Sequence, residues 1–171
     1  LKDFDAISVD STIKWQKKKN KPWQYEESFP ATEDMKDKGM VSVNWLINDE
    51  PLSLRDQLAW AVLNYVLIGT SASPLYKKLI SSGLGESVIG GGLSDELLQA
   101  TFSAGLKGVS LDDVDKVEDL VVKILKECVQ EGFSKEAIDA SMNSIEFSMR
   151  EFNTGSFPRG LSFMLGAMQH W

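Results

Sequence analysis

Residues 101–113 read TFSAGLKGVSLDD, in which an alternating stretch is followed almost at once by an acidic one. Alternation of apolar and polar side chains over residues 101–107 is typical of a β-strand with one buried face. Ser110 can then start a helix, with Asp112 and Asp113 in its first turn, where carboxylates suit the helix dipole. The run therefore predicts a strand joined directly to a helix.

Two amphipathic helices are predicted after this strand. The first ends at Gly132, and Ser134 caps the second. Apolar residues recur in both at spacings of three and four, which is typical of a helix face that packs against a core. Cys128 lies on the first stripe, so a buried, inert thiol is favoured over a nucleophile. The stripes consist of Val114, Val117, Val121, Ile124, Leu125 and Cys128, and of Ile138, Met142, Ile145, Met149 and Phe152.

The segment upstream adds a further strand and two helices. Residues 40–47 alternate in the same way and predict a strand. A helix is expected from its cap, Ser53, to Gly69, which would end it by adopting a positive φ. A short helix over residues 75–82 follows, opened by Pro74. The core face of the longer helix is expected to be Leu54, Leu58, Ala61, Val62, Tyr65 and Val66.

The order of the elements indicates the fold class. Residues 1–39 are predicted to hold one strand, over the alternating residues 7–15, and a long polar connection over residues 20–39. Residues 40–171 would form the sheet-and-helix core. A mainly antiparallel sheet with its helices segregated to one face is an α+β fold, and residues 1–171 are expected to form a single domain.

A glycine run at residues 88–93 (VIGGGL) allows two interpretations. Bare backbone N–H groups after a strand-like pair could cradle a phosphate. The next residues are Ser94, Asp95 and Glu96, whose carboxylates would lie where phosphate oxygens would have to be. A flexible strand or turn that runs close to another backbone is therefore favoured over a nucleotide site.

Basic residues gather near the N-terminus beside Trp15 and Trp23. Lysines interleaved with aromatic side chains can bind RNA or another anionic surface. A solvated strand end or loop is favoured here, because the chain as a whole is acidic. The lysines are Lys14, Lys17, Lys18, Lys19 and Lys21.

Composition excludes several classes of protein. The chain has 171 residues, a net charge of −7 and 43% hydrophobic residues, which indicates one globular domain and excludes a disordered chain. The acidic balance argues against nucleic-acid binding, and the longest apolar run, residues 58–68, is too short to span a membrane. One His and one Cys leave no multi-histidine zinc site and no internal disulfide. No catalytic residue and no metal ligand are therefore expected in this chain.

Several long stretches carry a family resemblance. They are residues 73–79 (SPLYKKL), 82–85 (SGLG), 91–99 (GGLSDELLQ), 105–109 (GLKGV), 140–148 (ASMNSIEFS) and 153–162 (NTGSFPRGLS), with 13–18 (IKWQKK) and 43–46 (VNWL) upstream. The chain resembles the presequence protease and falcilysin branch of the pitrilysin-type zinc metallopeptidases (M16, subfamily C). The likeness covers nearly the whole chain and is weakest in residues 20–39. It implies a metallohydrolase domain like those of pitrilysin and the processing peptidases.

The resemblance also implies a division of labour within a longer protein. Family members look like two homologous halves that close around an unfolded peptide, each with two α+β domains. Zinc is held in the first domain by an inverted His-x-x-Glu-His motif and a distal Glu, and an Arg-Tyr pair in the other half assists the substrate. This chain corresponds to the second domain of the first half. It is expected to be cut from a longer chain and to hold no cofactor itself, whereas the parent would hold zinc.

The expected function follows from that position. This chain would be a non-catalytic structural domain of an organellar zinc metalloendopeptidase that degrades presequence (transit) peptides and other short unstructured peptides. Its place would be the mitochondrial matrix or a plastid. Expected partners are the catalytic zinc domain, the C-terminal half of the parent and unfolded peptides, with no nucleic acid and no membrane. The isolated piece is expected to self-associate. The alternative is an inactive peptide-binding or assembly subunit related to the processing peptidases.

Residues 153–160 are the candidate contact site. Glycine and proline interrupt a helical pattern there and predict a bend between two helices. The bend is ascribed to Gly155, Pro158 and Gly160. The residues predicted to contact a neighbouring domain or a peptide are Asn153, Thr154 and Arg159. The alternative is an ordinary helix–helix connection in which the arginine is satisfied locally.

Overall fold

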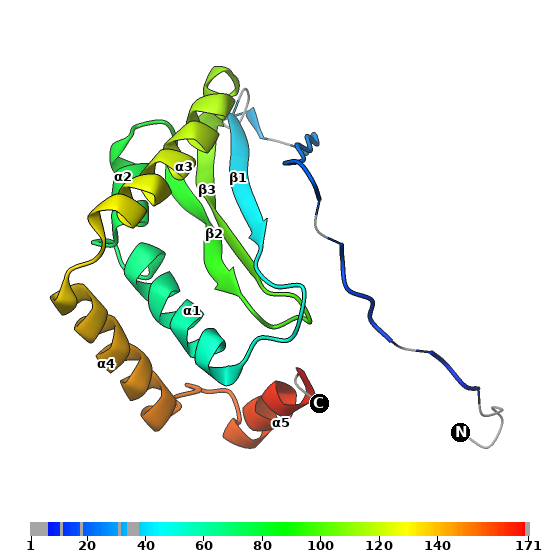
Figure 1. The fold of residues 1–171 in the computed structure, drawn as a ribbon. Coiled ribbons are helices and arrows are strands. Elements are labelled where there is room, and N and C mark those ends of the chain that lie inside the picture. The colour runs from blue at the N-terminus through cyan, green and yellow to red at the C-terminus, as the bar shows by residue number, and fades with distance from the viewer. Residues whose placement is uncertain (1–6, 11, 18, 31, 34–37, 170–171) are drawn as a thin grey trace.

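The computed structural model describes residues 7–10, 12–17, 19–30, 32–33 and 38–169. Over these residues the protein is an α+β fold, a three-stranded antiparallel sheet with helices on one face (Figure 1). None of the described helices is both long and apolar enough to cross a membrane. The elements are β1 (Lys38–Leu46), α1 (Leu54–Ile68), α2 (Pro74–Ser81), β2 (Ser87–Ser94), β3 (Thr101–Ser110), a 3₁₀ turn (Leu111–Asp113), α3 (Val114–Glu131), α4 (Lys135–Glu151) and α5 (Arg159–Gln169).

The central strand is β3, which pairs antiparallel with β1 on one side and β2 on the other. Phe102, Ala104 and Leu106 are buried under the helices, so the alternation predicted for this strand is confirmed. The register against β1 shifts by one residue and skips Gly108, which brings Val109 onto the same buried face.

The core lies between the sheet and helices α1, α2 and α3. The stripe predicted for α3 is confirmed: its central residues are fully buried, and Cys128 is buried with them. Burial raises the pKa of the Cys128 thiol, which keeps it protonated. The cluster consists of Leu67, Leu75, Leu79, Phe102, Ala104, Leu106, Val109, Val117, Val121, Ile124 and Cys128.

Helix α1 begins as predicted, because the Ser53 hydroxyl accepts a hydrogen bond from the Asp56 N–H at 3.2 Å. The core face predicted for α1 is partly wrong. Leu54 is 82% exposed and Leu58 is also exposed, whereas Leu67 joins the core cluster. The physical reason is that α1 carries apolar side chains on more than one face, so periodicity alone does not select the buried one.

The end of α1 also differs from the prediction. Gly69 has a φ of −68°, so the positive φ expected there is wrong. Its N–H still donates to the carbonyl of Tyr65 at 3.0 Å. A Cβ at this position would lie 2.7 Å from that carbonyl oxygen, so glycine is required by close contact and not by its backbone angle.

The glycine run of β2 runs close to two neighbours, as predicted. A Cβ on Gly90 would lie 2.8 Å from the backbone of Ser103. Gly92 has a φ of +74°, and a Cβ there would lie 2.0 Å from the Asn64 side-chain oxygen. The same oxygen accepts a hydrogen bond from the Leu93 N–H at 2.8 Å. The glycines therefore let β2 approach both β3 and α1.

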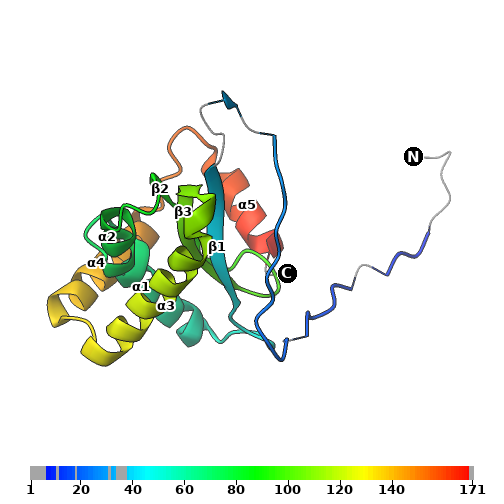
Figure 2. The ribbon, with the colours of Figure 1, turned by 90° about the horizontal axis from the view of Figure 1, so that it is seen from above.

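The strand expected over residues 7–15 is wrong for the described part of that range. Ile7, Val9 and Ile13 are exposed, and the described N-terminal residues lie to one side of the body (Figures 1 and 2). Alternation makes a strand only where another strand supplies hydrogen-bond partners. Here the Gln16 backbone pairs instead with one side chain: its N–H donates to Oε1 of Gln99 at 2.6 Å and its carbonyl accepts from Nε2 at 3.2 Å.

Candidate functional site

The chain turns sharply between α4 and α5, in the region singled out by the sequence. Phe152 adopts a left-handed conformation with φ 32° and ends α4. The Asn153 side-chain oxygen accepts from the Gly155 N–H at 2.9 Å, and the Thr154 hydroxyl donates to the Phe157 carbonyl at 2.6 Å. Asn153 and Thr154 therefore stabilise the turn through their own side chains.

Arg159 and Gly160 lie beyond the turn, in the first turn of α5. Arg159 is exposed, and none of the ion pairs between described residues involves its guanidinium. The two helices are joined by a stacked pair, Phe152 and Phe163, whose ring centroids are 4.3 Å apart. The structure thus separates the predicted residues: Asn153 and Thr154 within the turn, and Arg159 on the helix after it.

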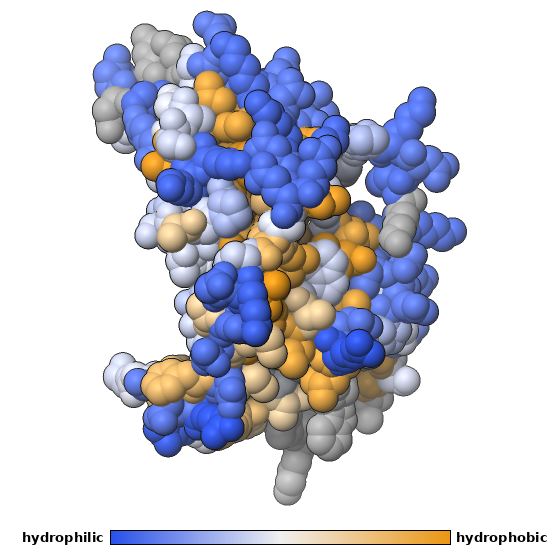
Figure 3. All heavy atoms as spheres, turned by 60° about the vertical axis from the view of Figure 1, so that its left-hand side comes forward, coloured by the Kyte–Doolittle hydropathy of each residue, from blue (hydrophilic) through white to orange (hydrophobic). Residues whose placement is uncertain are grey.

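A hollow between α1 and α4 is a surface feature that the sequence did not reveal. We call it the α1–α4 groove; it has a volume of about 650 Å³. Figure 3, in which the left-hand side of Figure 1 is turned forward, shows hydrophobic side chains gathered in a band on this side of the molecule. The groove is lined by Leu58, Val62, Asp139, Met142, Asn143, Ile145, Glu146, Met149 and Arg150.

The packing role predicted for the α4 stripe is therefore only partly correct. Met142 is 53% exposed and Met149 is 69% exposed, because α4 packs beside α1 and not on the sheet. The buried residue of α4 is Ser141, whose hydroxyl donates to the Ala137 carbonyl at 2.7 Å. The available signal was the pair of methionines, since flexible thioether side chains suit adaptable binding surfaces.

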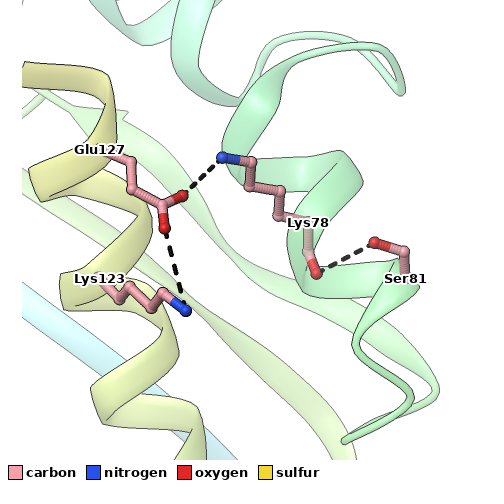
Figure 4. A network of polar contacts seen from close by, with 4 residues as sticks. All are labelled: Lys78, Ser81, Lys123 and Glu127. Atoms are coloured by element: carbon pink, nitrogen blue, oxygen red, sulfur yellow. Dashed lines mark hydrogen bonds and ion pairs between the residues drawn. The ribbon is translucent and has the colours of Figure 1, made fainter. Parts of the chain in front are cut away.

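A polar network joins α2 to α3 on the outside of the core (Figure 4). The Lys78 ammonium donates to one oxygen of Glu127 at 2.6 Å, and Lys123 lies 4.0 Å from the other. The hydrogen bond raises the pKa of Lys78 and lowers the pKa of Glu127, in each case favouring the charged form. This network ties two helices together, so we assign it a structural role.

The described residues hold no cluster of metal-binding side chains. Among them, no three His, Cys, Asp or Glu side chains gather where they could hold a metal ion. The lysines near the N-terminus are exposed where described, with Lys19 lying 4.9 Å from the ring centroid of Trp23; Lys18 falls outside the described residues.

Comparisons with known proteins agree with this picture. Residues 2–145 match the family described as "Peptidase M16 inactive domain". The chain is 53% identical over 94% of its length to presequence protease 1, chloroplastic/mitochondrial, of Arabidopsis thaliana, and 36% identical over its whole length to protein HypA of Clostridium perfringens. The solved inactive peptidase domain of a zinc protease of Bordetella parapertussis has the same fold, with a TM-score of 0.60, 16% identity, and 76% and 74% of the two chains covered.

The relatives are much longer than this chain, which spans 15% of the Arabidopsis protein and 18% of the Clostridium one. The match to the family covers most of the chain, and the fold agrees with it. The chain therefore belongs to the M16 peptidase family, as an inactive domain of the presequence protease branch.

Proposed function

We propose that this chain is a non-catalytic structural domain of a longer zinc metalloendopeptidase that degrades presequence (transit) peptides and other short unstructured peptides. The observation that carries the proposal is the 53% identity to a plant presequence protease over 94% of the chain. A match of that extent, together with the inactive-domain family, favours the same structural role in the same kind of enzyme.

The chemistry of the parent enzyme would come from outside this chain. A catalytic zinc site needs three protein ligands and an open position for water. No group of three suitable side chains occurs among the described residues, so the residues here do not fit a zinc ion. We propose that the zinc belongs to a separate catalytic domain of the parent. This domain would pack against it and against the C-terminal half, and would help to enclose the peptide chamber.

The turn after α4 is proposed as one point of contact. Arg159 presents an exposed guanidinium suited to pairing with a carboxylate of a neighbouring domain or of a peptide. Asn153 and Thr154 would shape the turn that places it. Replacing Arg159 with Gln should lower peptide cleavage by the parent enzyme without changing the folding of this domain.

The compartment proposed for the parent is an organelle, the mitochondrial matrix or a plastid. The support is the naming of the relatives, which include a chloroplastic/mitochondrial protein of Arabidopsis and a mitochondrial one of Yarrowia lipolytica. Fluorescence microscopy of the tagged parent protein would decide between the two.

Two measurements test the proposal together. In the first, the isolated chain is purified, its zinc content is measured and it is incubated with a fluorogenic presequence peptide; we expect no stoichiometric zinc and no cleavage. In the second, this chain replaces the matching segment of the Arabidopsis enzyme, and we expect the chimera to cleave the peptide. The matched control is the same chimera with Ile124→Asp, which should lose activity through a broken core.

Three outcomes separate the possibilities. One tightly held zinc per isolated chain would contradict the non-catalytic role. A chimera that folds and binds zinc yet cleaves nothing would contradict the proposed place in a presequence protease. A parent protein without a His-x-x-Glu-His motif would favour the alternative, an inactive peptide-binding or assembly subunit.

A further inference from the structure

The strand β1 forms one edge of the sheet, because β3 is its only partner among the described strands. The outward backbone N–H and C=O groups of an edge strand are free to pair with a further strand. Beside this edge lies a hollow of about 370 Å³, which we call the β1 hollow. Its lining is mostly apolar, so this side of β1 offers both backbone hydrogen bonds and a surface for apolar side chains. The lining residues are Trp45 from β1 and Val122, Leu125, Lys126, Val129 and Gln130 from α3.

The chain before β1 is held at both ends of this strand. At one end, the Gln16 backbone is hydrogen-bonded to the Gln99 side chain. That side chain also donates to the carbonyl of Asn48 at 3.0 Å, two residues beyond the end of β1. At the other end, the chain continues directly into Lys38, where β1 begins. The intervening segment therefore runs in the direction opposite to β1, and in both views its described part lies on the side of β1 away from β3 (Figures 1 and 2).

The segment is long enough to follow the whole edge. The 21 residues between Gln16 and Lys38 can span about 70 Å when extended, whereas the 9 residues of β1 span about 30 Å. Its described residues, 17, 19–30 and 32–33, form no strand and share no backbone hydrogen bond with β1. The segment thus has slack, and the structure shows the edge of β1 open.

Within this segment, residues 22–29 (PWQYEESF) alternate as a half-buried strand does. Trp23, Tyr25 and Phe29 fall on one face, and Glu27 is the one charged residue on that face. The Trp23 and Tyr25 rings lie next to each other, with centroids 5.9 Å apart. Trp23 is 72% exposed and Tyr25 is 69% exposed, although aromatic side chains stabilise a fold most when they are buried. In the open arrangement these rings are therefore an uncovered apolar face.

We propose that residues 22–29 are a strap that closes onto the free edge of β1 as a fourth, antiparallel strand. In an antiparallel pair, residues directly opposite each other lie on the same face of the sheet. Pairing of odd-numbered with odd-numbered residues places the aromatic face of the strap on the side of Val43 and Trp45, which is the side of the β1 hollow. Trp23 and Tyr25 then fill the hollow, and the strap covers the backbone groups of the edge.

Closure of the strap keeps the β1 edge from pairing with another chain. An exposed edge strand is a template for association between sheets, so covering it protects the domain. Because the strap is tethered to both ends of β1, its effective concentration at the edge is on the order of millimolar, which favours it over a second chain at lower concentration. The strap and its site belong to this chain alone, so the inference does not depend on the proposed function.

The first test is amide hydrogen exchange of the whole chain, measured by mass spectrometry and corrected for intrinsic rates. Trp23→Thr combined with Tyr25→Thr removes the aromatic face but keeps residue types that favour strands. Gln24→Thr combined with Glu26→Thr is the matched control on the opposite face. We expect residues 22–29 to exchange at least about tenfold faster in the aromatic variant than in the unchanged chain, and at the unchanged rate in the control. Circular dichroism melts establish that both variants are folded.

The second test locates the strap by disulfide formation under mild oxidation. Gln24→Cys is combined in turn with Met40→Cys, Ser42→Cys or Asn44→Cys, the β1 residues on the face away from the helices. We expect one of the three pairs to cross-link and so to define the register, since a disulfide needs Cα atoms within about 7 Å of each other. Gln24→Cys with Ser103→Cys is the control. Ser103 lies opposite Asn44 on β3, one strand further from the strap, so this pair should not cross-link.

Three results would overturn the proposal. Equal exchange of residues 22–29 in the unchanged chain, the aromatic variant and the control would show that the aromatic face does not hold the segment. Absence of cross-linking at all three β1 positions would show that the segment does not reach the edge. Cross-links that form between molecules, as covalent dimers whose yield rises with protein concentration, would assign the edge to a second copy of the chain.

Discussion

Helices α3 and α4 are nearly equal in length, at 18 and 17 residues, and both carry an apolar stripe with the same spacing. In the folded chain they differ sharply. The stripe of α3 is buried against β1 and β3, whereas Met142 and Met149 of α4 are more than half exposed beside α1. An apolar stripe thus identifies the face of a helix that suits packing. Whether that face is buried within the same chain depends on tertiary packing.

The largest expected difference between the two helices is in stability. Ile124→Ala on α3 removes a fully buried side chain and leaves a cavity in the core, so the free energy of unfolding should fall by about 2–5 kcal/mol. Met142→Ala on α4 should cost less than about 1 kcal/mol, because the side chain is 53% exposed. Urea denaturation of both variants measures the difference. Equal losses would mean that α4 is as firmly packed in solution as α3.

A pair of glycines extends the comparison to the backbone. Gly92, in β2 where it faces α1, has a φ of +74° and no room for a Cβ, whereas Gly155, in the turn after α4, has a φ of +58° and open space around it. Gly155→Ala should cost about 1–2 kcal/mol, the penalty for a left-handed conformation alone. Gly92→Ala should cost more, because it also displaces Asn64 from its hydrogen bond to Leu93. Thermal unfolding of the two variants checks the order, and a smaller loss for Gly92→Ala would contradict it.

The smallest effect concerns the ion pair that ties α3 to α2. Lys78 holds the pKa of Glu127 below its ordinary value, so the pair stabilises the fold above the pKa of the unfolded glutamate, about 4.3. That contribution is lost as the pH falls through the lowered pKa, and again as the pH rises through the raised pKa of Lys78. The stability advantage over Glu127→Gln should therefore be present at neutral pH and disappear in acid.

Urea denaturation at a series of pH values follows this advantage. Glu118→Gln serves as the control, since Glu118 is an exposed residue of the same helix that forms no ion pair with another described residue. An advantage of the same size at all acidic pH values would show that the Lys78 contact does not form in solution.

Much of the fold could be predicted from the sequence, because in those segments the local pattern and the tertiary contacts favour the same structure. The alternation of β3, the α3 stripe and the Ser53 cap all lead to the structure observed. Predictions failed where the structure of a segment depends on which other segment packs against it. Residues 7–15 alternate without a neighbouring strand among the described residues, and α1 is apolar on more than one face.

The candidate site was harder to predict for the same reason. The glycine and proline of the turn after α4 are local signals, so the sequence could identify residues 153–160 as a region of interest. The α1–α4 groove joins residues about 80 positions apart, such as Leu58 and Met142, and no periodicity within either helix indicates that the two ridges lie side by side. Only the packing of α4 on α1 creates it.

Labelling of Cys128 can be used to measure how often the core of the domain opens. This residue is the only cysteine in the chain, it lies among the core side chains of α3, and its thiol is kept protonated by burial. A thiol reagent can reach it only when α3 separates from the sheet, so the rate of labelling measures how often the core opens. A bound partner that stabilises the whole domain would slow that rate.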